Sequence, residues 1–234
     1  MARGLELTPR LRRLADWVPL GTRLAGTDHA YLPVWLVLEG RVASAIASDL
    51  RPGPLQRAKE TAKTYGTEID CRLCNGLTCI TPDEVDTIVI AGMGGETIAA
   101  ILSAAPWTAM GHHTLLLQPM TRSEALRLFL MDHGYAIKRE ALVLDRGTIY
   151  PCMEVIAGQM RLSTGQLWGG AFLRQDPLGD TYIIQKIIRL QSAIAGLRHS
   201  ERPDDYEKAD RLREIVTALL SMREEWRHAN GPGN

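Results

Sequence analysis

The chain has 234 residues, 45% of them hydrophobic, and a formal net charge of +0 at pH 7. This length and composition fit one large domain or one domain with an appendage, and the charge excludes a uniformly basic surface. No apolar stretch approaches the roughly 18 residues that a membrane-spanning helix needs, so we expect no membrane contact. Residues 1–17 have no apolar signal core, and we expect them to belong to the mature fold of a cytoplasmic protein.

A short amphipathic helix is predicted near the start of the chain. Thr8-Pro9 fits an N-cap followed by a first-turn proline, and Pro19 ends the helix. Apolar residues recur at helical spacing between these points, at Leu11, Leu14, Ala15 and Val18. Residues 1–23 hold five arginines and two acids, a net charge of +3, so the neutral total does not exclude a local basic patch there.

From residue 22 to about 157, strand-like and helix-like segments alternate. The predicted strands are 22–25, 42–48, 69–73, 86–92 and 113–119, and the predicted helices are 30–39, 53–65, 95–104 and 122–133. Strands that alternate with helices indicate a parallel sheet covered on both faces. Two further strands flank the turn signal Asp145-Arg146-Gly147 and predict a terminal antiparallel hairpin. The predicted fold class is therefore α/β, a Rossmann-like domain with a mostly parallel sheet.

The last third of the chain has a different pattern. Residues 162–170 are predicted to be a loop or linker. Two heptad patterns follow and predict an antiparallel helical hairpin. Their seam positions are Ile183, Ile187, Leu190, Ile194 and Leu197, then Ala209, Leu212, Val216, Leu219 and Trp226. We expect a Rossmann-like domain at 1–160 and a coiled-coil appendage at 161–234.

The four cysteines are expected to be ordinary thiols. They are Cys71, Cys74, Cys79 and Cys152. Without an export signal a disulfide framework is not expected. Cys71 and Cys74 have the spacing of half a zinc site, but no second pair follows, and His112-His113 is a poor substitute. We therefore expect no metal.

Residues suited to ligand binding follow four successive predicted strands. They are Gly26 to His29, Asp49, Asn75-Gly76, and the AGMGGE segment at 91–96; Gln118-Pro119 follows the fifth strand. Ligands of doubly wound sheets bind beyond the carboxyl ends of such strands. Each feature also has a simpler interpretation, since a carboxylate can cap a helix, Asn-Gly can be a turn, and the glycines can be a tight connection. Their shared position on one edge favours a nucleotide-type cofactor.

The chemistry of the candidate residues narrows the choice of cofactor. A dinucleotide needs the Gly-x-Gly-x-x-Gly phosphate cradle after the first strand, and this chain lacks it. S-adenosylmethionine has no phosphate, but needs an acid for its ribose and a polar group for its adenine. Asp49 and Asn75 meet these needs.

Four blocks of the sequence resemble the bacterial tRNA (adenine-22-N1)-methyltransferases. The blocks are TDHAYLP, AIASDLRPGPLQRAK, EVDTIVIAGMGG and LLLQPM, in that order, and the similarity covers nearly the whole chain. The resemblance implies a class I methyltransferase that uses S-adenosyl-L-methionine to methylate N1 of adenosine 22 in tRNA, with the helical hairpin as a tRNA-binding arm. It also implies a cytoplasmic protein, and we expect a monomer.

The resemblance also implies roles for individual residues. The implied cofactor-binding residues are Gly26, Asp28, His29, Asp49, Leu50, Asn75, Gly76, Gly92, Met93 and Gly94. The implied substrate-binding residues are Tyr31, Pro33, Gly95, Gln118 and Pro119. Asp28 is the candidate to stabilise the cationic product ring or take a proton, and Tyr31 is the candidate platform for the base. Packing of Tyr31 against the core is the alternative.

Two departures from the family pattern motivate a second hypothesis. The family has two more residues, one of them acidic, between Ala25 and Gly26, and it usually has Gly-Asp-Gly where this chain has Cys74-Asn75-Gly76. Both changes weaken one site, so the alternative is an RNA-binding protein on the same scaffold with reduced or lost turnover. A nicotinamide-dependent oxidoreductase is a third hypothesis, which lacks its phosphate cradle. Arg51, Arg57 and Lys59 are candidates for phosphate contacts or ordinary solvated charges.

Overall fold

The computed structural model describes residues 4–26, 31–197 and 202–230. The chain forms two compact units. The first comprises Met1–Arg139 and Val143–Met160, and the second comprises Glu140–Leu142 and Arg161–Asn234.

The first unit is built on a seven-stranded sheet with the order β3-β2-β1-β4-β5-β7-β6. The strands are β1 Thr22–Gly26, β2 Val42–Asp49, β3 Asp70–Leu73, β4 Thr87–Gly94, β5 Thr114–Thr121, β6 Tyr135–Asp145 and β7 Thr148–Ala157. The first five strands pair in parallel, and β7 pairs antiparallel with β5. The mostly parallel sheet and the terminal hairpin predicted from the sequence are confirmed.

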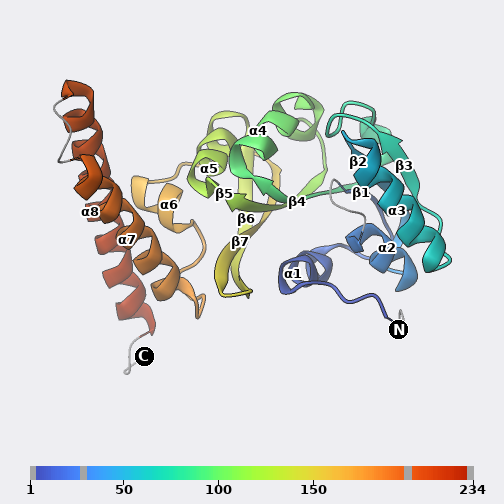
Figure 1. Cartoon of the computed structure of the whole chain (residues 1–234), viewed down its shortest axis with the longest axis horizontal. Coiled ribbons are helices and arrows are strands. Elements are labelled where there is room, and N and C mark those ends of the chain that lie inside the picture. The colour runs from blue at the N-terminus through green and yellow to red at the C-terminus, as the bar shows by residue number, and fades with distance from the viewer. Residues whose placement is uncertain (1–3, 27–30, 198–201, 231–234) are drawn as a thin grey trace. The chain divides into compact units, whose positions relative to one another are not determined.

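Helices cover both faces of this sheet. They are α1 Pro9–Trp17, α2 Tyr31–Leu38, α3 Pro52–Thr64, α4 Gly95–Ser103 and α5 Ser123–Asp132, with 3-10 turns η1 Pro82–Glu84 and η2 Pro106–Ala109. Figure 1 shows α4 and α5 on the opposite side of the sheet from α1. The two-sided cover explains why the central strands are continuous apolar runs without polar alternation.

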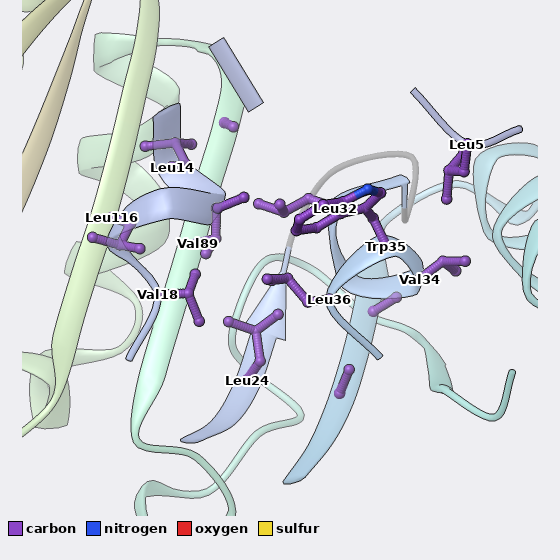
Figure 2. Close-up of a cluster of buried hydrophobic side chains, with 14 of the residues drawn as sticks. Leu5, Leu14, Val18, Leu24, Leu32, Val34, Trp35, Leu36, Val89 and Leu116 are labelled. Carbon is purple, nitrogen blue, oxygen red and sulfur yellow. The ribbon is translucent and has the colours of Figure 1, made fainter. Parts of the chain in front are cut away.

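The core on the α1–α3 side joins residues that are distant in the sequence. Leu14 of α1 and Val18, which follows the helix, belong to one cluster with Leu24 of β1, Val89 of β4 and Leu116 of β5 (Figure 2). Leu14, Leu24 and Leu116 are fully buried. This cluster fixes α1 onto the parallel strands, as the spacing of its apolar residues predicted.

The described residues of the second unit form three helices. They are α6 Thr164–Gly169, α7 Gly179–Leu197 and α8 Pro203–Asn230. The seam residues Ile183, Ile187, Leu190, Ile194, Val216 and Leu219 form one buried cluster. The heptad pattern therefore predicted the α7–α8 pair and its buried face.

One local prediction was wrong. The segment predicted to be a linker contains α6, which begins with a capping box: Ser163 Oγ accepts from the Gln166 N–H, and Gln166 Oε1 accepts from the Ser163 N–H. Thr8 is the N-cap residue of α1, as predicted, although its side chain makes no capping hydrogen bond and its hydroxyl is buried without a partner. No helix among the described residues is long and apolar enough to span a membrane.

Candidate functional site

The candidate site lies at the carboxyl edge of the central strands, where the strand order reverses. Gly26, the last residue of β1, pairs with Ala47 of β2 on one side and Val89 of β4 on the other. Asp49 lies two residues beyond Ala47, and Gly92 lies three residues beyond Val89. The acid and the glycine turn therefore share one edge of the sheet, at the topological switch point where doubly wound folds bind ligands.

Asn75 and Gly76 lie next to Asp49. The Cys74 N–H donates to the Asp49 carbonyl oxygen at 2.9 Å, and Ser48 Oγ donates to the Gly76 carbonyl oxygen at 2.8 Å. Asn75 is exposed. The structure thus brings together the acid and the amide that the sequence assigned to the ribose and the adenine.

The Asp49 side chain is oriented by the backbone that follows it. Its Oδ1 accepts from the Arg51 N–H at 2.8 Å, immediately before α3 begins. This bond fits the simpler interpretation of Asp49 as a helix-end residue. It occupies one lone pair of one oxygen, so it is compatible with ligand binding by the same carboxylate.

The glycine-rich segment turns sharply at the end of β4. Gly92 has φ +75°, and its pairing with β5 is irregular on both sides of Met93. Gly92 is exposed, and Met93 and Gly94 are partly buried. A residue with a side chain rarely adopts this backbone conformation, so glycine is required at position 92.

The substrate-side residues are more deeply buried than the sequence suggested. Gln118 is fully buried, and its amide is engaged: Oε1 accepts from the Gly92 N–H at 3.3 Å, and Nε2 donates to the Pro119 carbonyl oxygen at 3.0 Å. Pro119 and Gly95 are also buried. As the structure stands, these residues hold the rim of the site in place, and their contact with substrate stays a prediction.

Tyr31 and Pro33 occupy the first turn of α2. Tyr31 is 46% exposed, which favours a surface role over core packing. Pro33 is buried, and its Cγ lies 2.9 Å from the position that a Cβ at Gly26 would occupy. Glycine is therefore needed at the end of β1 because α2 approaches so closely. Asp28 and His29 lie outside the described residues.

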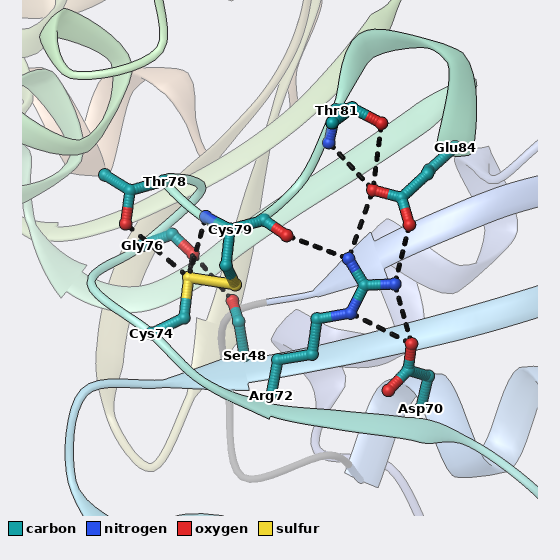
Figure 3. Close-up of a disulfide and its surroundings, with 9 residues drawn as sticks. All are labelled: Ser48, Asp70, Arg72, Cys74, Gly76, Thr78, Cys79, Thr81 and Glu84. Atoms are coloured by element: carbon teal, nitrogen blue, oxygen red, sulfur yellow. Dashed lines mark hydrogen bonds and ion pairs between the residues drawn. A yellow bond between two sulfur atoms is a disulfide. The ribbon is translucent and has the colours of Figure 1, made fainter.

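One prediction about the cysteines was wrong. Cys74 and Cys79 form a disulfide, which closes the loop that carries Asn75 and Gly76 (Figure 3). Cys71 and Cys152 are free, as expected. Cellular compartment and zinc spacing carry no information about this pairing. The turn after β3 decides it, because it brings the Cα atoms of Cys74 and Cys79 to 6.0 Å from each other.

Arg72 anchors the far end of the same loop (Figure 3). Its Nη2 lies 2.7 Å from Asp70 Oδ2 and 2.7 Å from Glu84 Oε1, and its Nη1 donates to the Cys79 carbonyl oxygen at 2.8 Å. Hydrogen bonds from Arg72, and then from Thr81, lower the pKa of Glu84 to about 2. Within the described part of the chain, no group of three His, Cys, Asp or Glu side chains could hold a metal ion.

Comparison with known proteins identifies the family. A family model described as a methyltransferase domain matches residues 7–153. The tRNA (adenine(22)-N(1))-methyltransferase of Bacillus subtilis is 36% identical over 94% of this chain and 97% of its own length. This chain belongs to the tRNA (adenine(22)-N(1))-methyltransferase family. The family resemblance stated from the sequence blocks is thereby confirmed.

Solved structures agree with this assignment. The Bacillus subtilis m1A22 tRNA methyltransferase TrmK has a TM-score of 0.85 and 30% identity, covering 94% of this chain and 99% of that chain. A Streptococcus pneumoniae structure in complex with S-adenosyl-L-methionine has a TM-score of 0.81 and 32% identity, covering 93% of this chain and all of that one. The fold similarity extends over both units.

Two residues that the sequence did not single out, Ser48 and Arg10, contribute to the rim of the site. Arg10 reaches Gln118 from α1, and Ser48 holds Gly76 from β2. A serine inside a strand and an arginine on a helix carry no local signal of such a role, because only the tertiary structure brings their partners near.

Proposed function

We propose that this chain transfers a methyl group from S-adenosyl-L-methionine to N1 of adenosine 22 in tRNA. The observation that carries the proposal is the common edge shared by Asp49, Asn75 and Gly92 at the switch point of the sheet, in a chain of the tRNA (adenine(22)-N(1))-methyltransferase family. An acid, an amide and an exposed glycine turn are the groups that a phosphate-free adenosyl cofactor needs.

The chemistry of these residues fits S-adenosyl-L-methionine. Asp49 would accept hydroxyl hydrogen bonds from the ribose, and Asn75 would accept from the adenine amino group. The turn at Gly92 would let the backbone of 92–94 approach the cofactor closely. When bound, the cofactor supplies an electrophilic methyl group on a sulfonium.

The protein has a limited task in the reaction because adenine N1 is already nucleophilic. Its in-plane lone pair is unprotonated at neutral pH, so no base is needed before attack. The residues of the site must align the base and exclude water. Tyr31, exposed at the start of α2, would stack on the extruded base, and Asp28 would stabilise the positive charge of the product ring or take a proton from its amino group.

The helical unit is our candidate for the tRNA-binding arm. Residues 178–228 hold equal numbers of basic and acidic side chains, so binding there would depend on local contacts rather than on net charge. The seam between α7 and α8 is buried within this chain. Because the apolar face already has its partner, we propose a monomer, acting in the cytoplasm where its substrate is found.

The alternative remains an RNA-binding protein with the same fold and reduced turnover. β1 ends at Gly26, and the family pattern has two more residues before this glycine. Calorimetry with S-adenosyl-L-methionine and methyl transfer to unmodified tRNA distinguish the two. Activity on a transcript with adenosine at position 22 and none on one with guanosine there is expected, whereas the absence of cofactor binding at millimolar concentration refutes the enzyme proposal.

Three variants sharpen this test. Asp49→Asn should weaken cofactor binding, while Asp83→Asn, at the opposite edge of the sheet before β4, should leave it unchanged. Insertion of Asp-Val after Ala25 restores the length of the family loop. Higher activity after insertion would show that the shortened loop reduces function, and equal activity would show that the loop closes without it.

A further inference from the structure

Arg10 joins the first helix to the end of the sheet. Its Nε lies 2.6 Å from Asp145 Oδ2, and the Asp145 side chain is 5% exposed. The guanidinium carbon lies 4.8 Å from the centre of the Tyr150 ring. An arginine held by a buried carboxylate and an aromatic face has a fixed orientation.

The same guanidinium fixes the orientation of the Gln118 side-chain amide. Arg10 Nη1 donates to Gln118 Oε1 at 3.0 Å, and this oxygen also accepts from the Gly92 N–H at 3.3 Å. The Gln118 Nε2 donates to the Pro119 carbonyl oxygen, so the amide cannot flip without losing three bonds. Gly92 is therefore connected to Asp145 through two side chains.

We propose that Arg10 is a positioning residue for the turn at Gly92. Arg10 holds the Gln118 side chain in place, and Gln118 Oε1 in turn holds the Gly92 N–H, which keeps the Gly92 backbone in its left-handed conformation. This inference rests on the proposed function, in which the turn at Gly92 borders the methyl donor. Without Arg10, the Gln118 oxygen is free to move away from Gly92, and the Gly92 N–H loses the side-chain acceptor that Gln118 provides.

A double-mutant cycle tests the connection. Arg10→Met and Gln118→Met are measured alone and together for S-adenosyl-L-methionine affinity by calorimetry, without tRNA. Each single change is expected to weaken binding about tenfold, and the second change should add less than about twofold once the first is made. Arg13→Met is the matched control, since Arg13 is an exposed arginine on the same helix, and it should leave cofactor affinity unchanged.

Amide hydrogen exchange at Gly92 supplies a readout that does not depend on activity. Exchange is expected to be faster in both Arg10→Met and Gln118→Met than in the wild type or Arg13→Met. Arg10→Met leaves Asp145 buried without its partner, so Arg10→Met/Asp145→Asn is the second variant if the first does not fold.

The outcomes separate this inference from the proposed function. Additive losses of affinity, or unchanged exchange at Gly92 in a folded Arg10 variant, overturn the positioning role while leaving methyl transfer intact. A wild-type protein that binds no S-adenosyl-L-methionine refutes the proposed function, and the exchange measurement then still decides whether Arg10 holds the turn.

Discussion

Gly95→Ala is expected to disturb the start of α4 strongly, although the substitution adds only one methyl group. An ideal Cβ at Gly95 would lie 2.2 Å from the Arg122 carbonyl oxygen and 3.1 Å from that of Thr121, where ordinary contact begins at 3.4 Å. The helix or the β5–α5 junction must move by roughly 1 Å. Thr121 is held by its pairing with Gly94, so the backbone has little freedom to yield. Overpacking of this kind costs about 2 kcal/mol.

Urea unfolding followed by circular dichroism measures this cost. The variant should lose about 2 kcal/mol of unfolding free energy without a change in the denaturant slope. Gly196→Ala is the opposite control: Gly196 is helical and exposed with nothing within 4 Å of its Cβ position, so alanine should stabilise α7 by up to about 1 kcal/mol. The two glycines lie in different compact units, and their transitions can be assigned if they separate. A Gly95→Ala protein as stable as the wild type would refute the steric argument.

Three further predictions concern other parts of the chain. Replacing Cys74 and Cys79 by serine should lower the free energy of unfolding by about 2 kcal/mol, which is the loop-closure entropy of so short a loop. A reductant should have no further effect on the stability of this variant. Unchanged stability after the replacement would contradict a formed disulfide. The pKa of Glu84 in the folded protein is about 2, so the stabilisation by its carboxylate is present above the ordinary pKa of 4.5 and is lost as the pH falls toward 2. In an acid titration, the free energy of unfolding of Glu84→Gln should therefore decrease less over that range than that of the wild type. An identical decrease would exclude the Glu84 ion pair as its source. Leu219→Ala should lower the free energy of unfolding by about 3 kcal/mol because the side chain is fully buried in the α7–α8 seam. Its neighbour Leu220 is 43% exposed and should tolerate alanine. Equal effects of the two changes in thermal or urea unfolding would show that the seam is wrongly placed.

The elements were predictable because their signals are local and periodic. The apolar runs of β4 and β5 indicated strands buried on both faces, and the heptad spacing of α7 and α8 indicated a paired seam. The capping box at Ser163 and Gln166 was also a readable signal for α6, but a short helix rich in glycine has too weak an apolar pattern to outweigh the loop prediction.

The candidate site was predictable in position and less so in detail. The alternation of strands and helices implies that Asp49, Asn75 and Gly92 follow parallel strands on one edge of the sheet. It gives no information about which side chains are buried behind that edge. Gln118 was predicted to meet the substrate, yet in the folded chain it is fully buried and bonded to Arg10 and Gly92.

The sequence by itself determined the family, the strand–helix alternation and the paired helices, because each depends on residue types at fixed local spacing. Only the tertiary structure decided the Cys74–Cys79 bond and the chain of contacts from Asp145 through Arg10 to Gln118. The two Arg10 contacts join residues more than 100 positions apart, and the packing of α1 onto the sheet selects these partners. The disulfide joins residues five positions apart, and the turn after β3 brings them together.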